Sequence, residues 1–363
     1  MEIKYYLNFA EDHRVSMNQY AQQLIDYQSE NFKDLKINFY QPKLSYFSKF
    51  IFLNNWKLRF SRYISYPNQV KKLPKHDVAH ICDHQYAHLF PYLNSKLKFI
   101  TVHDLVPLIF QNELNINPRL FKFSLNSLKF FTKVFTVSNN TKKDILRYTD
   151  CPENKIKVIM ESIEPFFNND TIDKKAISEK YNLPLNKKKI LISGNIFYKN
   201  QDTSYKVLKK LNEVDKNIVF IHIGSGNLKN DIIKKDDNNI IRLPFVDRVE
   251  LPKIYKLADI LLFPSIYEGF GLPILESMSC GTPVVCSNNS SIKEIIGDSA
   301  LSSNYDDVKS FTKNILNLLS NDTLYKTMVQ KGLLRAKFFD IKKFHNNLIE
   351  TYNHELSKFH QAQ

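Results

Sequence analysis

Short, uninterrupted runs of apolar residues recur along the chain, and helix-length amphipathic stretches separate them. Continuous rather than alternating apolar runs are typical of strands that are buried on both faces of a parallel sheet. The pattern therefore predicts an α/β protein built on parallel sheets. The expected strands are residues 36–40, 78–82, 98–103, 134–138, 156–160, 189–193, 218–223, 240–243, 260–264 and 283–287.

Two series of these runs predict two doubly wound domains. A polar, loop-like stretch, EPFFNNDTIDKK, begins at Glu164 and separates the two series. We expect a first Rossmann-like domain over residues 1–168 and a second over residues 169–340. The segment 341–363 contains the last expected helix, which we expect to cross back to the first domain.

Glycine is distributed unevenly, since all eight glycines lie at or after Gly194. Glycine permits tight strand-to-helix turns and lets the backbone approach a ligand closely. The second domain is therefore the expected nucleotide or phosphate binder.

Composition excludes several classes of protein. With 43% apolar residues, the 363-residue chain can bury a substantial core, which excludes wholesale disorder. The sequence contains no run of about 18 apolar residues, so we expect no membrane-spanning helix. The first residues, MEIKYYLNFAEDHR, do not resemble a secretory signal. Four cysteines without CxxC pairing favour a reducing compartment, so we expect a cytoplasmic protein.

The densest motif is YEGFGLPILESMSCGTPVVCSN, at residues 267–288. Gly269 and Gly271 free the backbone where a helix begins, and helix N-termini bind anions through their unpaired N–H groups. Glu268 lies in the turn, and Glu276 lies on the helix, where a carboxylate can hold the two hydroxyls of a ribose. The alternative is that Glu268 caps the helix and Glu276 is a solvated residue.

The spacing Glu268-x7-Glu276, within EGFGLPILE and followed by GTPVV, resembles the donor-site signature of retaining glycosyltransferase family 4 (group 1 glycosyltransferases, GT-B fold). Four further segments resemble that family, whereas roughly the first 75 residues match it weakly. These segments are ITVHDLVPL (100–108), FTVSNNTKKDIL (135–146), ISGNIFYKN (192–200) and LPKIYKLADILLFPS (251–265).

The resemblance implies two Rossmann-like domains that face each other across a cleft, with a nucleotide-diphospho-sugar in the second and an acceptor at the first. It implies that Glu268 contacts the donor sugar and phosphates, and that Glu276 holds the ribose. It also implies retention of the anomeric configuration, with the leaving phosphate taking the proton of the acceptor. The residues expected to bind the donor are Gly194, Asn195, Lys199, Gly224, Glu268, Gly269, Phe270, Gly271, Leu272 and Glu276.

Lys199, in ISGNIFYKN, follows a strand and a glycine turn, and it resembles the lysine of the family's phosphate loop. A fixed cation at this position stabilises the negative charge that grows on a diphosphate leaving group. Family members often carry an arginine nearby, where Asn195 and Tyr198 stand here. Gly224 and Gly226 suggest a dinucleotide fingerprint, but that pattern requires glycine at Lys229, so a turn beside the nucleotide is the expected role.

His103 and Asp104 follow an expected strand of the first domain, at the end where open α/β sheets place their ligands. The resemblance implies that His103 meets the donor sugar; the alternative is a packing histidine. Asp83 and His84 also end a strand and, with Asp104, are expected on the acceptor side. The expected catalytic residues are His103, Lys199 and Glu268.

We expect no metal and no cofactor besides the donor substrate, because Asp-x-Asp, the usual metal–diphosphate grip of the other glycosyltransferase fold, is absent. His76, His80, His84 and His88 have a spacing of four that suits ligands on one helix face. The expected strand at residues 78–82 breaks that geometry, which argues against a zinc site.

The net charge is +14, and no acidic residue occurs between residues 35 and 76. Phe52, Trp56, Phe60 and Tyr63 are spaced as on one helix face, with cations beside them, which is typical of a helix at an anionic membrane surface. The alternative is a solvated basic helix with its aromatic rings turned inward. The residues expected to face the membrane are Trp56, Lys57, Arg59, Phe60 and Arg62.

The expected function is therefore transfer of a sugar to a hydroxyl of a glycan or lipid-linked acceptor, in cell-surface polysaccharide synthesis. The expected location is the cytoplasm, at the inner face of the cytoplasmic membrane. Alternatives are a GT-B nucleotide-sugar epimerase or phosphorylase and a non-catalytic carbohydrate-binding relative. The positive charge also suggests nucleic-acid binding, but no recognition motif supports it, so no nucleic-acid partner is expected.

Overall fold

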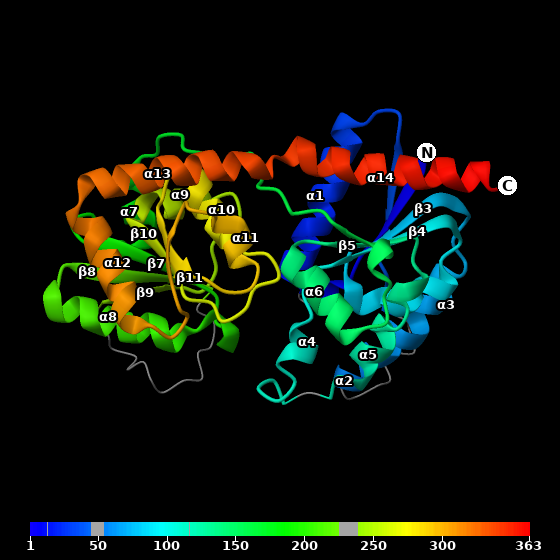
Figure 1. The fold of residues 1–363 in the computed structure, drawn as a ribbon, viewed down its shortest axis with the longest axis horizontal. Helices are drawn as coiled ribbons and strands as arrows, with labels where there is room; N and C mark the ends of the chain where they lie inside the picture. Colours follow the sequence, from blue (N-terminus) through cyan, green and yellow to red (C-terminus); the bar gives the residue numbers. More distant parts are fainter. Residues whose placement is uncertain (13, 45–53, 116, 225–238) are drawn as a thin grey trace. The chain divides into compact units, whose positions relative to one another are not determined.

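The computed structural model describes residues 1–12, 14–44, 54–115, 117–224 and 239–363. The chain divides into two compact units (Figure 1). The first unit comprises Met1–Met160 together with Lys342–Gln363, and the second comprises Glu161–Ile341. The sequence placed these divisions after residues 168 and 340.

The first unit contains a parallel six-stranded sheet in the order β2-β1-β3-β4-β5-β6. The order reverses between β1 and β3, and open α/β sheets place ligands at the strand ends beside such a reversal. The strands are β1 (Glu2–Tyr6), β2 (Lys36–Tyr40), β3 (His76–Ile81), β4 (Ser95–Val102), β5 (Lys133–Thr136) and β6 (Ile156–Val158).

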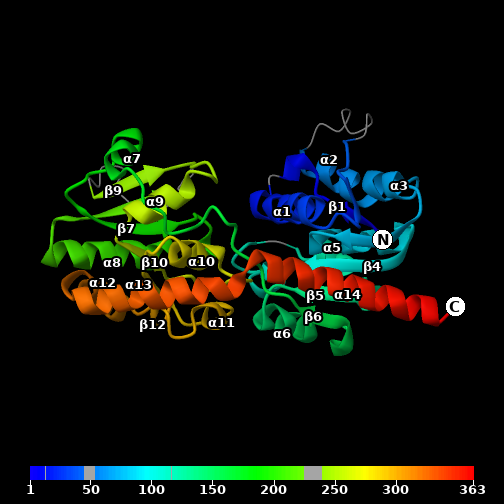
Figure 2. The ribbon, with the colours of Figure 1, turned by 90° about the horizontal axis from the view of Figure 1, so that it is seen from above.

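Helices cover both faces of this first sheet. On one face, α1 (Val15–Asn31) and α14 (Ile341–Gln361) pack against β1, β4 and β5 through a common apolar cluster (Figure 2). The other face carries α3, η4, α5 and α6. The remaining helical bounds are α2 (Asn54–Phe60), the π-helical turn η3 (Ser61–Ser65), α3 (Tyr66–Val70), η4 (His84–Tyr92), α4 (Val106–Ile109), α5 (Arg119–Leu125) and α6 (Asn139–Tyr148), with short 3-10 turns η1 (Ala10–Asp12), η5 (Leu128–Phe130) and η6 (Glu153–Lys155).

Helix α14 is fixed by buried polar contacts as well as by apolar packing. Tyr352 is fully buried, and its hydroxyl lies 2.5 Å from His80 Nδ1 of β3. His80 Nε2 lies 2.8 Å from Thr101 Oγ1, and Gln28 of α1 lies 3.2 Å from His345 Nδ1. Because these groups are buried, their mutual hydrogen bonds fix where α14 lies on the sheet.

The second unit contains a parallel six-stranded sheet in the order β12-β11-β10-β7-β8-β9, which reverses between β7 and β10. Its strands are β7 (Lys188–Ser193), β8 (Ile218–Ile223), β9 (Ile240–Leu243), β10 (Ile260–Phe263), β11 (Val284–Ser287) and β12 (Leu301–Ser303). Helices α8, α12 and α13 share one apolar cluster with this sheet. The helices are α7 (Lys174–Tyr181), α8 (Gln201–Val214), α9 (Leu251–Leu257), α10 (Leu272–Ser279), α11 (Ile292–Ile296), α12 (Val308–Ser320) and α13 (Asp322–Ala336), with 3-10 turns η7 (Phe197–Lys199) and η8 (Lys337–Phe339).

The expected α/β class with two doubly wound sheets is confirmed, and each expected strand overlaps an observed one. Strand β1 is missing from the expected set because Lys4 interrupts its apolar run, although Lys4 is buried in the sheet. Strand β12 is also missing from the expected set, because its three residues, Leu-Ser-Ser, form no apolar run. Within the described parts of the chain, no helix combines the length and apolar character needed to cross a membrane.

Candidate active site

The loop after β7 lies at the strand reversal of the second sheet. Gly194 adopts a φ of +80°, and its carbonyl accepts hydrogen bonds from Gln201 Nε2 and His222 Nε2. A Cβ atom on Gly194 would lie 3.0 Å from Lys199 Cγ. Glycine therefore permits the turn and leaves room for the Lys199 side chain to cross it.

Lys199 and Glu268 form an ion pair at this reversal. Lys199 Nζ donates to both carboxylate oxygens of Glu268, at 2.8 and 3.0 Å, and the Ser265 hydroxyl lies 2.5 Å from Oε1. Lys199 belongs to the loop after β7, and Glu268 belongs to the loop after the neighbouring β10. The two expected catalytic residues of this unit therefore meet, with their side chains largely buried.

The loop after β11 holds the Glu268 turn in place. The backbone N–H of Glu268 donates to Ser290 Oγ at 3.0 Å, and the Ser291 hydroxyl donates to the carbonyl of Phe270 at 2.6 Å. From the other side, the backbone N–H of Ile266 donates to the Tyr198 carbonyl at 2.7 Å. These contacts join three loops, so the position of the carboxylate is set before any ligand arrives.

The N-terminus of α10 begins directly after this turn. Gly271 has a φ of +123°, and a Cβ there would lie 3.2 Å from Ile295 Cδ1. No side chain of the described residues caps this helix end. The backbone from Phe270 to Leu272 therefore presents the positive end of the helix dipole beside Glu268, as an anion site requires.

Glu276 lies further along α10 and is buried. Tyr255 donates its hydroxyl hydrogen to Glu276 Oε2 at 2.7 Å, and Arg248 pairs with Oε1 and also with Glu164. Burial lowers the pKa of Arg248, but the two carboxylates outweigh it and raise that pKa above its usual range. The sequence reading missed Arg248 and Tyr255. The only signal for Arg248 is that arginine is scarce in a chain rich in lysine.

The other expected donor-site residues are placed as follows. Gly224 has a φ of +70°, and a Cβ on it would lie 3.7 Å from the backbone nitrogen of Gly194, so the two glycines are neighbours. Asn195 is exposed in the same loop, and Gly269 lies in the Glu268 turn. Gly226 and Lys229 lie outside the described residues.

Two of the expected acceptor-side residues, Asp83 and His84, are buried at the strand reversal of the first sheet, and Asp104 is half-buried. Asp83 is fully buried and accepts hydrogen bonds from Arg14 Nη1 at 2.6 Å and Asn8 Nδ2 at 2.9 Å. Burial would raise the pKa of Asp83, but Arg14 and its other partners hold it well below the usual range. Arg14 and Asn8 were not predicted from the sequence, because they belong to the loop after β1, a strand that was not expected.

The two histidines of this edge are also buried. His103 Nε2 donates to the Cys82 carbonyl at 3.0 Å, and Tyr20 meets the His103 ring edge-on at 4.7 Å. Burial lowers the pKa of His84 to about 4, against the influence of Asp83, so this ring is neutral near pH 7. Asp104 Oδ1 accepts from the backbone N–H of Val106 at the start of α4.

Some of the residues expected to face the membrane are exposed, and others contact other parts of the first unit. Trp56 is 61% exposed, and the Arg59 guanidinium lies 5.8 Å from the centroid of the Trp56 ring. Arg62 instead pairs with the buried carboxylate of Asp12 at 2.6 Å. Phe60 lines a hollow with Lys43, Leu44, Ile64 and Lys72. Lys57 is partly exposed, and Phe52 lies outside the described residues.

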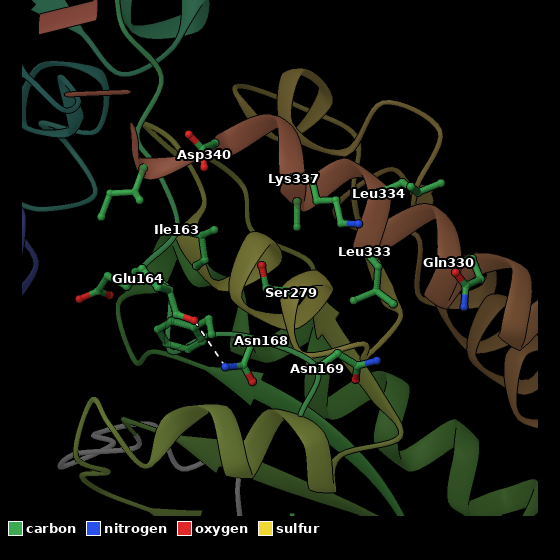
Figure 3. Close-up of a pocket in the computed structure, with 14 residues that line it drawn as sticks. Ile163, Glu164, Asn168, Asn169, Ser279, Gln330, Leu333, Leu334, Lys337 and Asp340 are labelled. Carbon is green, nitrogen blue, oxygen red and sulfur yellow. Dashed lines mark hydrogen bonds between the residues drawn. The ribbon is translucent and has the colours of Figure 1, made fainter. Parts of the chain in front are cut away.

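A cavity of about 570 Å³ lies elsewhere in the second unit, between the segment after Glu161 and α13 (Figure 3). Ser279, at the far end of α10 from Glu268, contributes to its wall, together with Leu333 and Leu334. Across the described residues, no cluster of three or more His, Cys, Asp or Glu side chains could hold a metal ion.

Residues 173–335 match the family model described as "Glycosyl transferases group 1". The O-antigen chain mannosyltransferase RfbU of Salmonella typhimurium is 31% identical over 241 residues, which cover 64% of this chain and 63% of that protein. The chain spans between 21% and 63% of the lengths of the curated relatives that it matches.

Two solved structures show the same fold. HepE of Anabaena, in complex with UDP-glucose, superposes with a TM-score of 0.76 at 13% identity, over 97% of this chain and 99% of that chain. WaaG, a glycosyltransferase involved in lipopolysaccharide biosynthesis, gives 0.72 at 12% identity, over 97% and 99%. The GT-B fold is therefore confirmed. Residues 173–335 match the family that the motifs resemble.

Proposed function

We infer from the match of residues 173–335 to the group 1 glycosyl transferases that this chain moves a sugar from a nucleotide-diphospho-sugar to an acceptor hydroxyl. The observation that carries this proposal is the Lys199–Glu268 pair beside the N-terminus of α10. A fixed cation and a helix end together suit a diphosphate, and the neighbouring carboxylate suits the hydroxyls of the transferred sugar.

The proposed reaction keeps the anomeric configuration. Lys199 neutralises charge that develops on the departing diphosphate, which lowers the barrier to cleavage of the sugar–phosphate bond. The leaving phosphate takes the proton of the acceptor hydroxyl, so no covalent intermediate with the protein forms. We propose that no metal takes part, so EDTA should leave turnover unchanged; a loss of activity that Mg²⁺ or Mn²⁺ restores would contradict this.

The comparisons support a hexose donor and a polysaccharide product. RfbU is by its name an O-antigen chain mannosyltransferase, and HepE was solved with UDP-glucose. We therefore propose a hexosyltransferase of cell-surface polysaccharide synthesis that extends a glycan or lipid-linked acceptor. The exposed Trp56 and Arg59 support a further proposal, that the enzyme works as a peripheral protein on the inner face of the cytoplasmic membrane.

The experiment is a thermal-shift screen of the purified chain against UDP-, GDP-, dTDP- and ADP-hexoses, because a bound donor stabilises the folded state. The best donor is then incubated with lipid-linked and free glycan acceptors; mass spectrometry identifies the products, and NMR gives the configuration of the sugar and of its anomeric carbon. A glycosylated acceptor with the retained anomer supports the proposal. Three other results would contradict the proposal. An epimerised donor would indicate an epimerase, phosphate-dependent release of sugar phosphate would indicate a phosphorylase, and binding without any product would indicate a non-catalytic relative.

A further inference from the structure

Both oxygens of the buried Glu276 carboxylate are engaged by side chains of the same unit. Arg248 Nη1 pairs with Oε1, and the Tyr255 hydroxyl donates to Oε2 at 2.7 Å. Tyr255 is itself buried, and Glu276 is 4% exposed. The carboxylate is therefore held at two points and cannot rotate freely.

Arg248 is in turn fixed by contacts on three sides. Its Nε donates to Glu164 at 2.8 Å, its Nη2 pairs with the same carboxylate, and its guanidinium lies 4.7 Å from the centroid of the Phe167 ring. In Figure 3 the Glu164 carboxylate points away from Leu333 and Leu334 on α13, and thus away from that wall of the cavity described above. A planar guanidinium held in this way presents its remaining edge to Glu276 in one orientation.

Holding the carboxylate does not exhaust its capacity to accept hydrogen bonds. An ionised carboxylate offers about four acceptor positions, two on each oxygen. Arg248 and Tyr255 take one on each oxygen, which leaves one on each for a ligand. Two remaining acceptors on neighbouring oxygens match the two adjacent hydroxyls of a ribose.

We propose that Arg248 is a positioning residue, which together with Tyr255 orients Glu276 so that the nucleotide's 2′- and 3′-hydroxyls are recognised as a pair. This inference rests on the proposed function, because it needs a nucleotide at Glu276. It makes Arg248 a determinant of the preference for ribonucleotides over 2′-deoxyribonucleotides. Glu164 contacts Arg248 but not Glu276, and Phe167 and Glu276 also hold the guanidinium, so the loss of the Glu164 charge should change that preference much less than the loss of Arg248.

The test measures the ratio of the affinities for a ribonucleotide and its 2′-deoxy form, and not one affinity alone. Isothermal titration calorimetry gives the dissociation constants of UDP, GDP and ADP, and of the 2′-deoxy form of each, for the full chain. Wild type should prefer the ribonucleotide of its matching base, and Glu276→Gln should reduce that preference by about tenfold, the loss expected for a charged hydrogen bond. Arg248→Gln should reduce it by a similar factor, and Glu164→Gln should leave it within about twofold.

A merely structural arginine would give a different result. Arg248→Gln would then weaken both nucleotides equally and leave their ratio unchanged, which would overturn the inference while the proposed function stands. If Arg248→Gln does not fold, Tyr255→Phe keeps the buried ring and removes one of the two contacts; it should lower the ratio partway, and an unchanged ratio contradicts the proposal. A wild-type chain that binds only dTDP, which lacks the 2′-hydroxyl, overturns this inference alone, and one that binds no nucleoside diphosphate of the donor screen overturns the proposed function with it.

Discussion

Lys199 donates hydrogen bonds to both carboxylate oxygens of Glu268, although 69 residues separate them in the chain. The sheet explains the meeting, because β7 and β10 are neighbours at the strand reversal, and each residue lies in the loop that follows one of those strands. The pair therefore follows from the order of the strands and does not depend on proximity in sequence. Four predictions start from contacts of this kind.

Lys199→Ala should lower turnover more than it weakens binding of the bare nucleoside monophosphate. The lysine is proposed to act on diphosphate charge that grows in the transition state, so its loss falls mainly on kcat. Steady-state kinetics and calorimetry measure the two effects, and Lys206→Ala on the exposed side of α8 is the matched control. Equal losses for UMP or GMP and for the intact donor would place Lys199 away from the diphosphate.

His103→Ala should reduce sugar transfer while leaving binding of the nucleoside diphosphate nearly intact. His103 belongs to the first unit, and its proposed contact is with the donor sugar, which the nucleoside diphosphate lacks. His103→Gln keeps a hydrogen-bond donor for the Cys82 carbonyl. A loss of sugar transfer in this variant as well would therefore come from the lost imidazole and not from lost packing. Wild-type turnover in the alanine variant, with only a lower thermal midpoint, would make His103 a packing residue.

Acidification should destabilise the first unit through its buried histidines. Burial lowers the pKa of His80 and His345 to about 3 and that of His84 to about 4, whereas the unfolded residues titrate near 6.5. The unfolded state thus binds more protons between about pH 6.5 and these lowered values, so the free energy of unfolding falls as pH falls. Each histidine adds up to about 1.4 kcal/mol per pH unit.

The measurement is urea denaturation at steps between pH 7 and pH 4.5. His345→Gln should flatten the fall by about one histidine's share, and His354→Gln, at an exposed position of α14, should not. A fall with the same slope in His345→Gln and wild type would show that the acid sensitivity comes from other groups.

Vesicles of anionic lipid should capture the chain at low salt, and Trp56→Ser should reduce the recovered fraction severalfold. Trp56 is exposed beside Arg59, and each basic residue near such a surface contributes about 1 kcal/mol. Flotation with neutral and anionic vesicles, at low and high salt, measures the binding. Arg62→Gln is the control, because Arg62 is engaged by Asp12. Equal recovery with both lipids would exclude electrostatic docking and favour a water-soluble acceptor.

Much of the fold could be predicted because apolar runs report burial directly. The runs gave β2, β8 and β9 to the residue, whereas the buried Lys4 hid β1 and with it the loop that carries Arg14. Because β1 was not expected, Asn8 and Arg14, the two side chains that donate hydrogen bonds to Asp83, were not predicted either.

The candidate site divides in the same way. Motif spacing found Glu268 and Glu276 because both belong to one strand–turn–helix unit. Arg248 lies 28 residues from Glu276 and 84 from Glu164. Arg248 precedes α9, Glu164 precedes α7 and Glu276 lies on α10, so the tertiary fold and not local spacing brings these groups together. Arg62 was predicted from its spacing beside aromatic residues, and its ion pair with Asp12, 50 residues earlier, could not be predicted in that way.

Helix α14 gives the chain an unusual order of assembly. When the segment up to Met160 leaves the ribosome, α1 covers only part of one face of its sheet, because Tyr352, which covers Phe99 and Phe135, has not yet been made. The second unit, Glu161–Ile341, is continuous and can close on its own elements first. Protease protection of nascent chains stalled before and after Tyr352 measures this order. We therefore expect the part of the protein that is synthesised first to finish folding last, and in the interval its apolar face should be the surface that chaperones meet.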